Sequence, residues 1–115
     1  MPGEIVSPQG PDDRAAIRAV VESWHRATTA GEIARVLPLM TDDAVFLTHG
    51  HEPMRGRAAF ERTLAALLET HTIASSGIVR EVEVSGDLAY AWTDLTVTVS
   101  GRDGQPPMRR TGPTL

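Results

Sequence analysis

The side chains best suited to acid/base chemistry lie in residues 88–100, where polar and apolar residues alternate. Tyr90, Trp92 and Asp94 share one face of the predicted strand, because successive side chains of a strand point to opposite faces. Apolar surroundings disfavour the charged form of a carboxylate, so two flanking aromatic rings would raise the pKa of Asp94 into a useful acid/base range. The alternative is that Asp94 is solvated and the aromatic rings are core. The sequence leaves both interpretations open.

A second group of titratable residues lies directly after the predicted strand at 44–48. In this loop His49 and His51 flank Gly50, and Glu52 is adjacent. Imidazole is the commonest metal ligand, but this loop alone supplies too few ligands, so we predict a surface loop and no metal site. His49 is the better catalytic candidate, because it could act as an acid or base with Asp94 across a cavity. His25 is expected to face solvent.

Composition limits the other functions that this chain can have. Its 115 residues, 41% of them hydrophobic, fit one domain, and the net charge of −4 with scattered basic residues argues against a nucleic-acid partner. There is no cysteine, no glycine-rich phosphate loop and no dinucleotide motif, so no cofactor is expected. No apolar run approaches the ~20 residues that span a bilayer, so we expect no membrane partner and a cytoplasmic location.

Changes in hydrophobic spacing divide the chain into a flexible tail, residues 1–11, and one domain, residues 12–115. Three- and four-residue spacing predicts the helices, at 12–31, 33–37 and 57–71. β-branched content and two-residue spacing predict the strands, at 44–48, 72–85 and 88–100, with a last strand starting at 108. Helices followed by antiparallel strands indicate an α+β fold with a curved sheet that can enclose a cavity.

Two stretches of the chain resemble the nuclear transport factor 2-like superfamily. Ala30-Gly31-Glu32 with Thr41-Asp42-Asp43-Ala44-Val45-Phe46 is similar to the helix-turn-strand segment that opens those domains, and residues 54–60 resemble the start of their third helix. The similarity is greatest to the SnoaL-like and ketosteroid-isomerase-like groups. It implies a cone-shaped, curved antiparallel sheet wrapped around helices with an internal pocket. It also implies a closing strand that this chain lacks, so we expect the cone to be open on one side.

The resemblance also implies which residues line the pocket. It places Trp24 where ketosteroid isomerases have a tyrosine and Thr48 where they have an aspartate base, and neither side chain can perform that reaction. It puts Tyr90, Trp92 and Asp94 on the concave face of the sheet. The expected substrate-binding residues are Trp24, Phe46, Thr48, Phe60, Leu64, Tyr90 and Trp92. For Phe60 and Leu64, the alternative is simple core packing.

These observations predict a cofactor-independent enzyme that binds a small hydrophobic molecule and performs isomerisation, cyclisation or dehydration, with Asp94 and His49 as the catalytic pair. The alternative is a ligand-binding or dimerisation module without catalysis. A homodimer is expected through the outer face of the sheet, toward which we predict that Leu95, Val97 and Val99 point.

Overall fold

The computed structural model describes residues 11–48 and 50–115. The predicted tail, apart from Pro11, and the catalytic candidate His49 lie outside these residues. The helices are α1 (Pro11–Ala30), α2 (Ile33–Val36), the single 3₁₀ turn η1 (Leu37–Leu39) and α3 (Arg57–Thr70). The strands are β1 (Val45–Phe46), β2 (Met54–Arg55), β3 (His71–Ser85), β4 (Leu88–Gly101) and β5 (Met108–Thr114).

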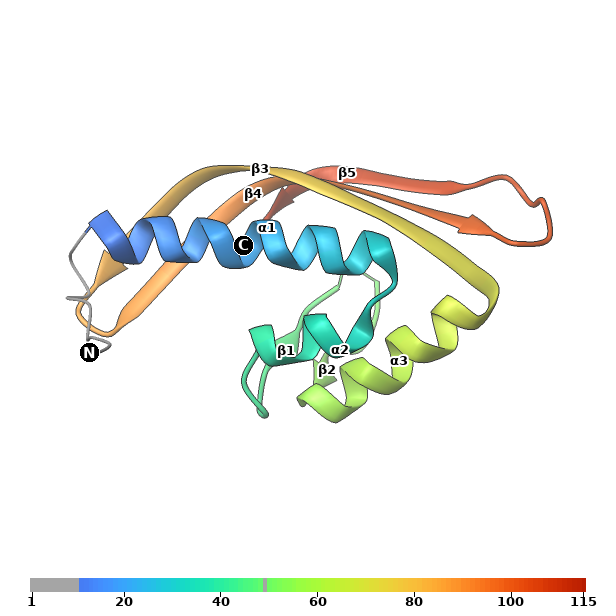
Figure 1. Cartoon of the computed structure of the whole chain (residues 1–115), viewed down its shortest axis with the longest axis horizontal. Helices are drawn as coiled ribbons and strands as arrows, with labels where there is room; N and C mark the ends of the chain where they lie inside the picture. The colour runs from blue at the N-terminus through green and yellow to red at the C-terminus, as the bar shows by residue number, and fades with distance from the viewer. Residues whose placement is uncertain (1–10, 49) are drawn as a thin grey trace.

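The first helix ends where the sequence predicts, at Gly31. This residue has a φ of 73°, a left-handed conformation that glycine adopts without a steric penalty. Its N–H donates to the carbonyl oxygen of Thr28, and the N–H of Glu32 donates to that of Ala27, which together form a Schellman motif. The chain reverses here, so that α2 packs back along α1 (Figure 1).

A two-stranded antiparallel pair, β1 with β2, leads into α3. Gly56 joins β2 to α3 with a φ of 91°, and its N–H donates to the carbonyl oxygen of Ala44. Arg57 then forms an ion pair with Asp42, and its backbone N–H donates to the Asp42 carbonyl oxygen. These contacts fix the direction in which α3 leaves the strand pair.

The larger sheet has three antiparallel strands in the order β3-β4-β5, and it arches over α1 and α3 (Figure 1). The register of β3 with β4 runs from His71 opposite Gly101 to Ser85 opposite Leu88, and it shifts between Val79 and Glu81. That shift is a β-bulge, which adds one residue, Arg80, to β3. The α+β fold with a curved antiparallel sheet is confirmed, and the sheets are not closed into a barrel.

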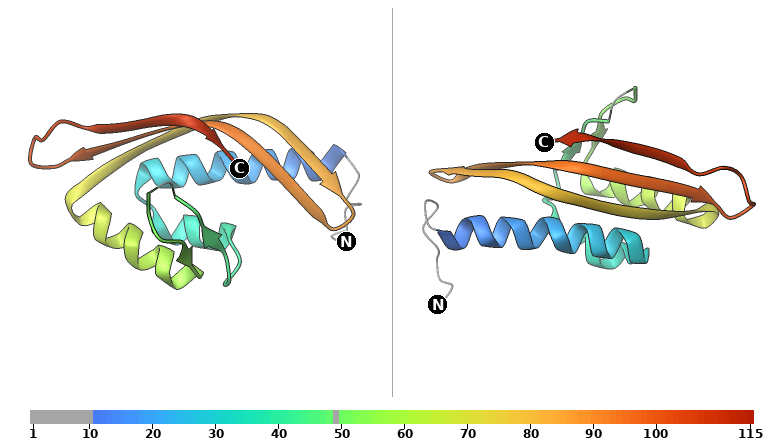
Figure 2. Two further views of the ribbon diagram at one scale, coloured as in Figure 1. Left: turned by 180° about the vertical axis from the view of Figure 1, so that it is seen from behind. Right: turned by 90° about the horizontal axis from the view of Figure 1, so that it is seen from above.

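α1 lies along the edge of β3 rather than under the middle of the sheet (Figure 2). Arg14 Nε donates to the carbonyl oxygen of Val82 at 3.3 Å, and Arg18 Nη1 donates to that of Val79 at 3.3 Å. A strand edge exposes unpaired backbone groups, and covering it with a helix is one way in which proteins protect it. α1 therefore covers this edge of the sheet and bonds to part of its backbone.

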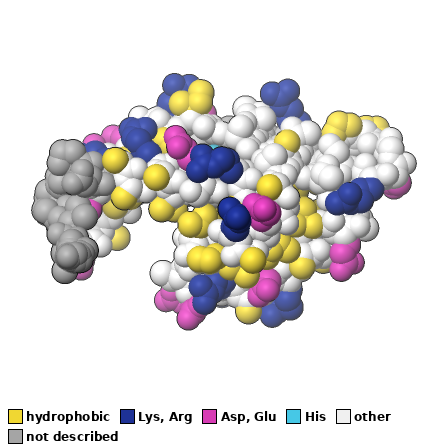
Figure 3. Space-filling view, viewed as in Figure 1, with side chains coloured by type: hydrophobic (Ala, Val, Ile, Leu, Met, Phe, Trp, Pro, Cys, Tyr) yellow, Lys and Arg dark blue, Asp and Glu magenta, His cyan; other side chains and the backbone are white. Residues whose placement is uncertain are grey.

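The buried apolar residues join α1, α2, α3 and β3. Among the described residues they are Ala27, Val36, Leu64, Ile73 and Val82. Acidic and basic side chains are interspersed over the face shown in Figure 3, and hydrophobic atoms gather below α1, over α2 and α3. In the part of the chain that the structure describes, no helix has the length and hydropathy needed to cross a membrane.

Candidate functional site

Contacts around Gly77 identify the face of the sheet that lies against α1. A Cβ built on Gly77 would lie 2.6 Å from Cγ2 of Thr93 and 2.9 Å from Nε2 of His25. The side chain of Thr93, and the direction that a side chain at Gly77 would take, are therefore toward the helix that carries His25. Thr93 is buried. Because β4 alternates, Leu95, Val97 and Val99 share this face with Thr93.

The predicted orientation of β4 is therefore wrong. Tyr90, Trp92 and Asp94 lie on the outer face of the sheet and not on its concave face. The physical reason is that alternation separates two faces without saying which is covered. Here the small and aliphatic residues pack toward α1, while the larger aromatic residues remain outside. The same reversal removes Leu95, Val97 and Val99 from the outer surface that we expected them to form.

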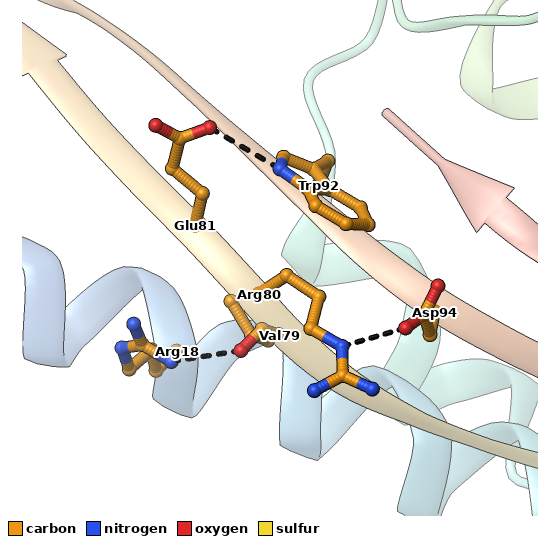
Figure 4. A network of polar contacts seen from close by, with 6 residues as sticks. All are labelled: Arg18, Val79, Arg80, Glu81, Trp92 and Asp94. Atoms are coloured by element: carbon orange, nitrogen blue, oxygen red, sulfur yellow. Dashed lines mark hydrogen bonds and ion pairs between the residues drawn. The ribbon is translucent and has the colours of Figure 1, made fainter.

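The outer face carries a network of polar contacts across β3 and β4 (Figure 4). Arg80 Nε donates to Oδ2 of Asp94 at 2.6 Å, and Trp92 Nε1 donates to Oε1 of Glu81 at 3.2 Å. The side chains of Arg80 and Asp94 are 48% and 40% exposed, so water screens this pair. Partial desolvation, followed by the charge of Glu81, raises the pKa of Tyr90. The catalytic role of Asp94 stays a prediction, but its carboxylate is already engaged with an arginine.

The β-bulge produces this arrangement. Without an extra residue, Arg80 and Glu81 would point to opposite faces, whereas here each contacts a residue of the outer face. Val79 and Val82 on either side both accept hydrogen bonds from α1. The bulge thus keeps two consecutive charged residues away from the face that packs on α1.

Three predicted pocket residues form an aromatic cluster between α1, β1 and α3. The ring centroids are 5.8 Å apart for Trp24 and Phe46, 5.4 Å for Trp24 and Phe60, and 4.6 Å for the stacked pair Phe46 and Phe60. Leu64 is buried, which fits core packing, and Thr48 is exposed. Since these aromatic rings contact one another, they hold α3 against α1, and their role in substrate binding stays a prediction.

His51 and Glu52 are the described titratable residues of the loop after β1. Both are exposed. Within residues 11–48 and 50–115, no three histidine, aspartate or glutamate side chains are grouped so that they could hold a metal ion.

One cavity, with a volume of about 930 Å³, lies along α1, α2 and the adjacent part of β3. It is open to solvent. The residues of β3 and α1 that line it include His25, Thr29, Ser75, Ser76 and Gly77. This volume is at the upper end of the range, about 300–1,000 Å³, that is typical of ligand pockets.

His25 lies in the wall of this cavity, so the expectation that it faces solvent is wrong. Its Nδ1 is 2.9 Å from Oγ of Ser75, and Nε2 is buried without a partner among the described residues. Burial lowers the pKa of His25 below its ordinary value of 6.5, so the neutral imidazole dominates near neutral pH. We assign the proton to Nδ1, because an unpaired lone pair on buried Nε2 costs less than an unpaired N–H.

In this tautomer His25 donates to Ser75 Oγ. The hydroxyl hydrogen of Ser75 is then free to point into the cavity and donate to an oxygen atom of a ligand. Thr29, one turn further along α1, holds the backbone of Ser75: its Oγ1 donates to the Ser75 carbonyl oxygen at 3.2 Å and accepts from the Ser75 N–H at 2.9 Å. The backbone and the hydroxyl of Ser75 are therefore both fixed by α1.

Sequence reasoning missed His25, Ser75 and Gly77. One signal was present, since His25 stands four residues after Val21 and eight after Ile17, on the apolar stripe of the helix. Ser75 and Gly77 had no comparable signal, because small residues in a strand are compatible with many environments.

Comparison with known proteins agrees with this fold. The family model of the SnoaL-like domain matches residues 17–113. A conserved protein from Planctomyces limnophilus is 31% identical, with a TM-score of 0.82 over 89% of this chain and 79% of that one. A ketosteroid isomerase-like protein from Erwinia carotovora atroseptica is 19% identical, with a TM-score of 0.75 over 89% and 79%.

An LEH-like epoxide hydrolase of M. tuberculosis has a TM-score of 0.65 at 19% identity, over 88% of this chain and 71% of that one. No curated protein matches the chain. The family match covers most of the chain, and the resemblance seen in its sequence is confirmed. The chain belongs to the SnoaL-like domain family and has the fold of the nuclear transport factor 2-like superfamily.

Proposed function

We propose that this protein is a cofactor-independent enzyme that binds a small, largely hydrophobic molecule in the cavity beside α1 and performs isomerisation, cyclisation or dehydration on it. The observation that carries the proposal is the pair of His25 and Ser75, with Nδ1 and Oγ 2.9 Å apart in the wall of that cavity. Ser75 donates a hydrogen bond to an oxygen atom of the substrate and polarises the bond that reacts. His25 orients the hydroxyl and, being neutral, adds no buried charge.

Two further points support this proposal. The cavity has the size of a small-molecule site, and a structural neighbour is named as an epoxide hydrolase, an enzyme that acts on an oxygen atom of a small molecule. Neither His25 nor Ser75 requires a metal or an organic cofactor for hydrogen-bond donation.

The alternative is a ligand-binding module without catalysis. One observation favours it: the hydrogen bond of His25 in the described structure goes to a serine and not to a carboxylate, and Asp94 lies on the opposite face of the sheet. A histidine without a carboxylate partner has a weaker means of stabilising the imidazolium that proton transfer creates.

Binding and turnover of cyclic ketones, epoxides and polycyclic phenols distinguish these functions. Binding is measured by thermal shift and conversion by mass spectrometry. We expect the parent protein to convert at least one compound, and Ser75→Ala to lower the rate about 100-fold, as for other single hydrogen-bond donors to a reacting oxygen. Ser85→Ala, an exposed serine of the same strand, is the matched control. Binding without conversion would support the ligand-binding module without catalysis. Equal rates for Ser75→Ala and the parent would reject the assigned site.

We also propose that the protein forms a homodimer through the outer face of the sheet, where Ile78 and Tyr90 are 58% and 45% exposed beside Trp92. Light scattering at micromolar concentration tests this. We expect twice the mass of the chain, and a monomer for Ile78→Arg. A monomeric parent would reject the dimer.

A further inference from the structure

The free edge of β3 carries backbone groups whose directions follow from the antiparallel pairing. In such a pair, residues alternate between those that bond to the partner strand and those that present both N–H and C=O to the other side. The N–H and C=O of Ser75 both bond to Thr29 of α1, so Ser75 presents its groups to the free edge. Gly77 and Val79 have the same parity before the bulge, and the Val79 carbonyl oxygen indeed accepts from Arg18.

Gly77 is therefore a gap between two edge positions that α1 covers. Its neighbours of the same parity, Ser75 and Val79, are bonded by α1 on either side of it. Within the described ranges, no backbone or side-chain group forms a hydrogen bond with the edge-facing N–H and C=O of Gly77. Gly77 is exposed and lines the cavity beside α1.

The free edge position at Gly77 lies beside the proposed site, because the absence of a side chain at Gly77 lets His25 pack against it. A Cβ at this position would come within 3.0 Å of His25 Nε2 and of the Thr93 methyl group. The N–H and C=O of Gly77 point along the edge instead, and Gly77 is exposed where it lines the cavity. One donor and one acceptor thus lie side by side in the same cavity, two residues along β3 from Ser75.

We propose that the cavity binds its ligand through a neutral carboxamide or lactam group, whose C=O accepts from the Gly77 N–H and whose N–H donates to the Gly77 C=O. This proposal rests on the function proposed above and names the chemical class that the same cavity takes. A carboxylate would face the Gly77 carbonyl oxygen, and an ammonium ion would face the Gly77 N–H, so either charged group leaves one backbone group opposed by a like charge. A neutral amide satisfies both.

An extended peptide does not fit the same edge. Adding a strand requires a run of free backbone groups, and here Thr29 and Arg18 occupy the positions on both sides of Gly77. Between these two positions the free length of edge is one residue. A small molecule with a single amide group matches it.

Nuclear magnetic resonance of the 15N-labelled full chain tests the proposal with three six-membered rings: 2-piperidone, its N-methyl derivative and δ-valerolactone. The last two have the same ring size and a carbonyl oxygen but no N–H donor. We expect 2-piperidone to shift the Gly77 amide resonance and slow its hydrogen exchange. The N-methyl derivative and the lactone should bind about tenfold more weakly, the loss expected for one hydrogen bond.

The amide of Gly112 on β5 is the internal control. Gly112 pairs with Leu95, which directs its backbone groups away from Gly77 and therefore toward Gly112. Its resonance should stay unchanged.

Three outcomes overturn the proposal: no shift at Gly77, equal binding of the lactam and the lactone, or equal shifts at Gly77 and Gly112. If 2-piperidone fails while ketones or epoxides still bind and react through Ser75, only the amide preference is rejected. If no compound of either set binds, the proposed function fails as well.

Discussion

The two faces of β3 and β4 belong to the same strands and differ in almost every physical respect. On the face toward α1, a single carbon atom added at Gly77 would collide with Thr93 and with His25. On the outer face, Arg80 and Asp94 form an ion pair whose side chains are each more than a third exposed. The first face depends on shape, and the second on charges that water screens.

The difference indicates where substitutions should matter. Tight packing resists added volume because neighbouring atoms have no free space, whereas exposed ion pairs can rearrange at little cost. The face toward α1 is therefore the sensitive one, although the outer face holds the residues that look more functional in the sequence.

The largest expected effect comes from Gly77→Ala. The new Cβ would lie 2.6 Å from Thr93 Cγ2 and 2.9 Å from His25 Nε2, so we expect the free energy of unfolding to fall by about 1–3 kcal/mol. Urea denaturation measures it. Gly112→Ala is the matched control, because a Cβ there meets nothing within 4 Å, and it should be neutral or slightly stabilising. Equal losses for both variants would show that the contact at Gly77 is not tight.

Thr29→Val should have the next largest effect. It keeps the shape of the side chain and removes the hydroxyl that both donates to and accepts from Ser75. Thr29 is exposed, so water replaces part of this interaction, and we expect a loss of about 1 kcal/mol in the free energy of unfolding. Thr29→Ser retains the hydroxyl and should stay close to the parent. A loss as large for Thr29→Ser as for Thr29→Val would mean that packing, not hydrogen bonding, matters at this position.

The pH dependence of stability tests the environment of His25. Burial lowers its pKa in the folded state, so below the ordinary value of 6.5 the unfolded chain binds more protons than the folded one. The free energy of unfolding should therefore fall as the pH drops below 6.5, until the lowered pKa is passed. Denaturant titrations at several pH values measure the slope, and His25→Gln should reduce it. An unchanged slope in His25→Gln would assign the dependence to other groups.

The smallest effect is expected on the outer face. Arg80→Gln and Asp94→Asn should each change the free energy of unfolding by less than about 1 kcal/mol, because the pair is exposed. A double-mutant cycle measures the interaction between them. Asp94→Asn also tests the catalytic role that the sequence suggested: it should leave turnover unchanged. A loss of turnover without a loss of stability would confirm Asp94 as a catalytic residue and place a second site on this face.

The sequence predicted the elements better than their orientation. The sequence predicted the helices that end at Ala30 and Thr70 and the long hairpin of β3 and β4. They follow from the period of the apolar residues, which changes from 3.6 residues in the helices to 2 in the strands. β2 was not expected, because two residues are too few to show alternation. The face of β4 was misassigned because it was carried over from the family resemblance, and the alternation of the strand does not say which face α1 covers. The approach of α1 depends on His25 and Gly77, which are 52 positions apart, and no local pattern reports it.

The hydrogen bonds from α1 to β3 also predict an order of events during folding. Thr29 is 46 residues from Ser75, Arg18 is 61 from Val79, and Arg14 is 68 from Val82. Closing such long loops is slow, whereas the hairpin of β3 and β4 forms from neighbouring segments. The edge of β3 is thus exposed until α1 docks, and in that interval it can pair with another chain. Substitutions that weaken these contacts should increase aggregation during refolding more than they lower the stability of the folded protein.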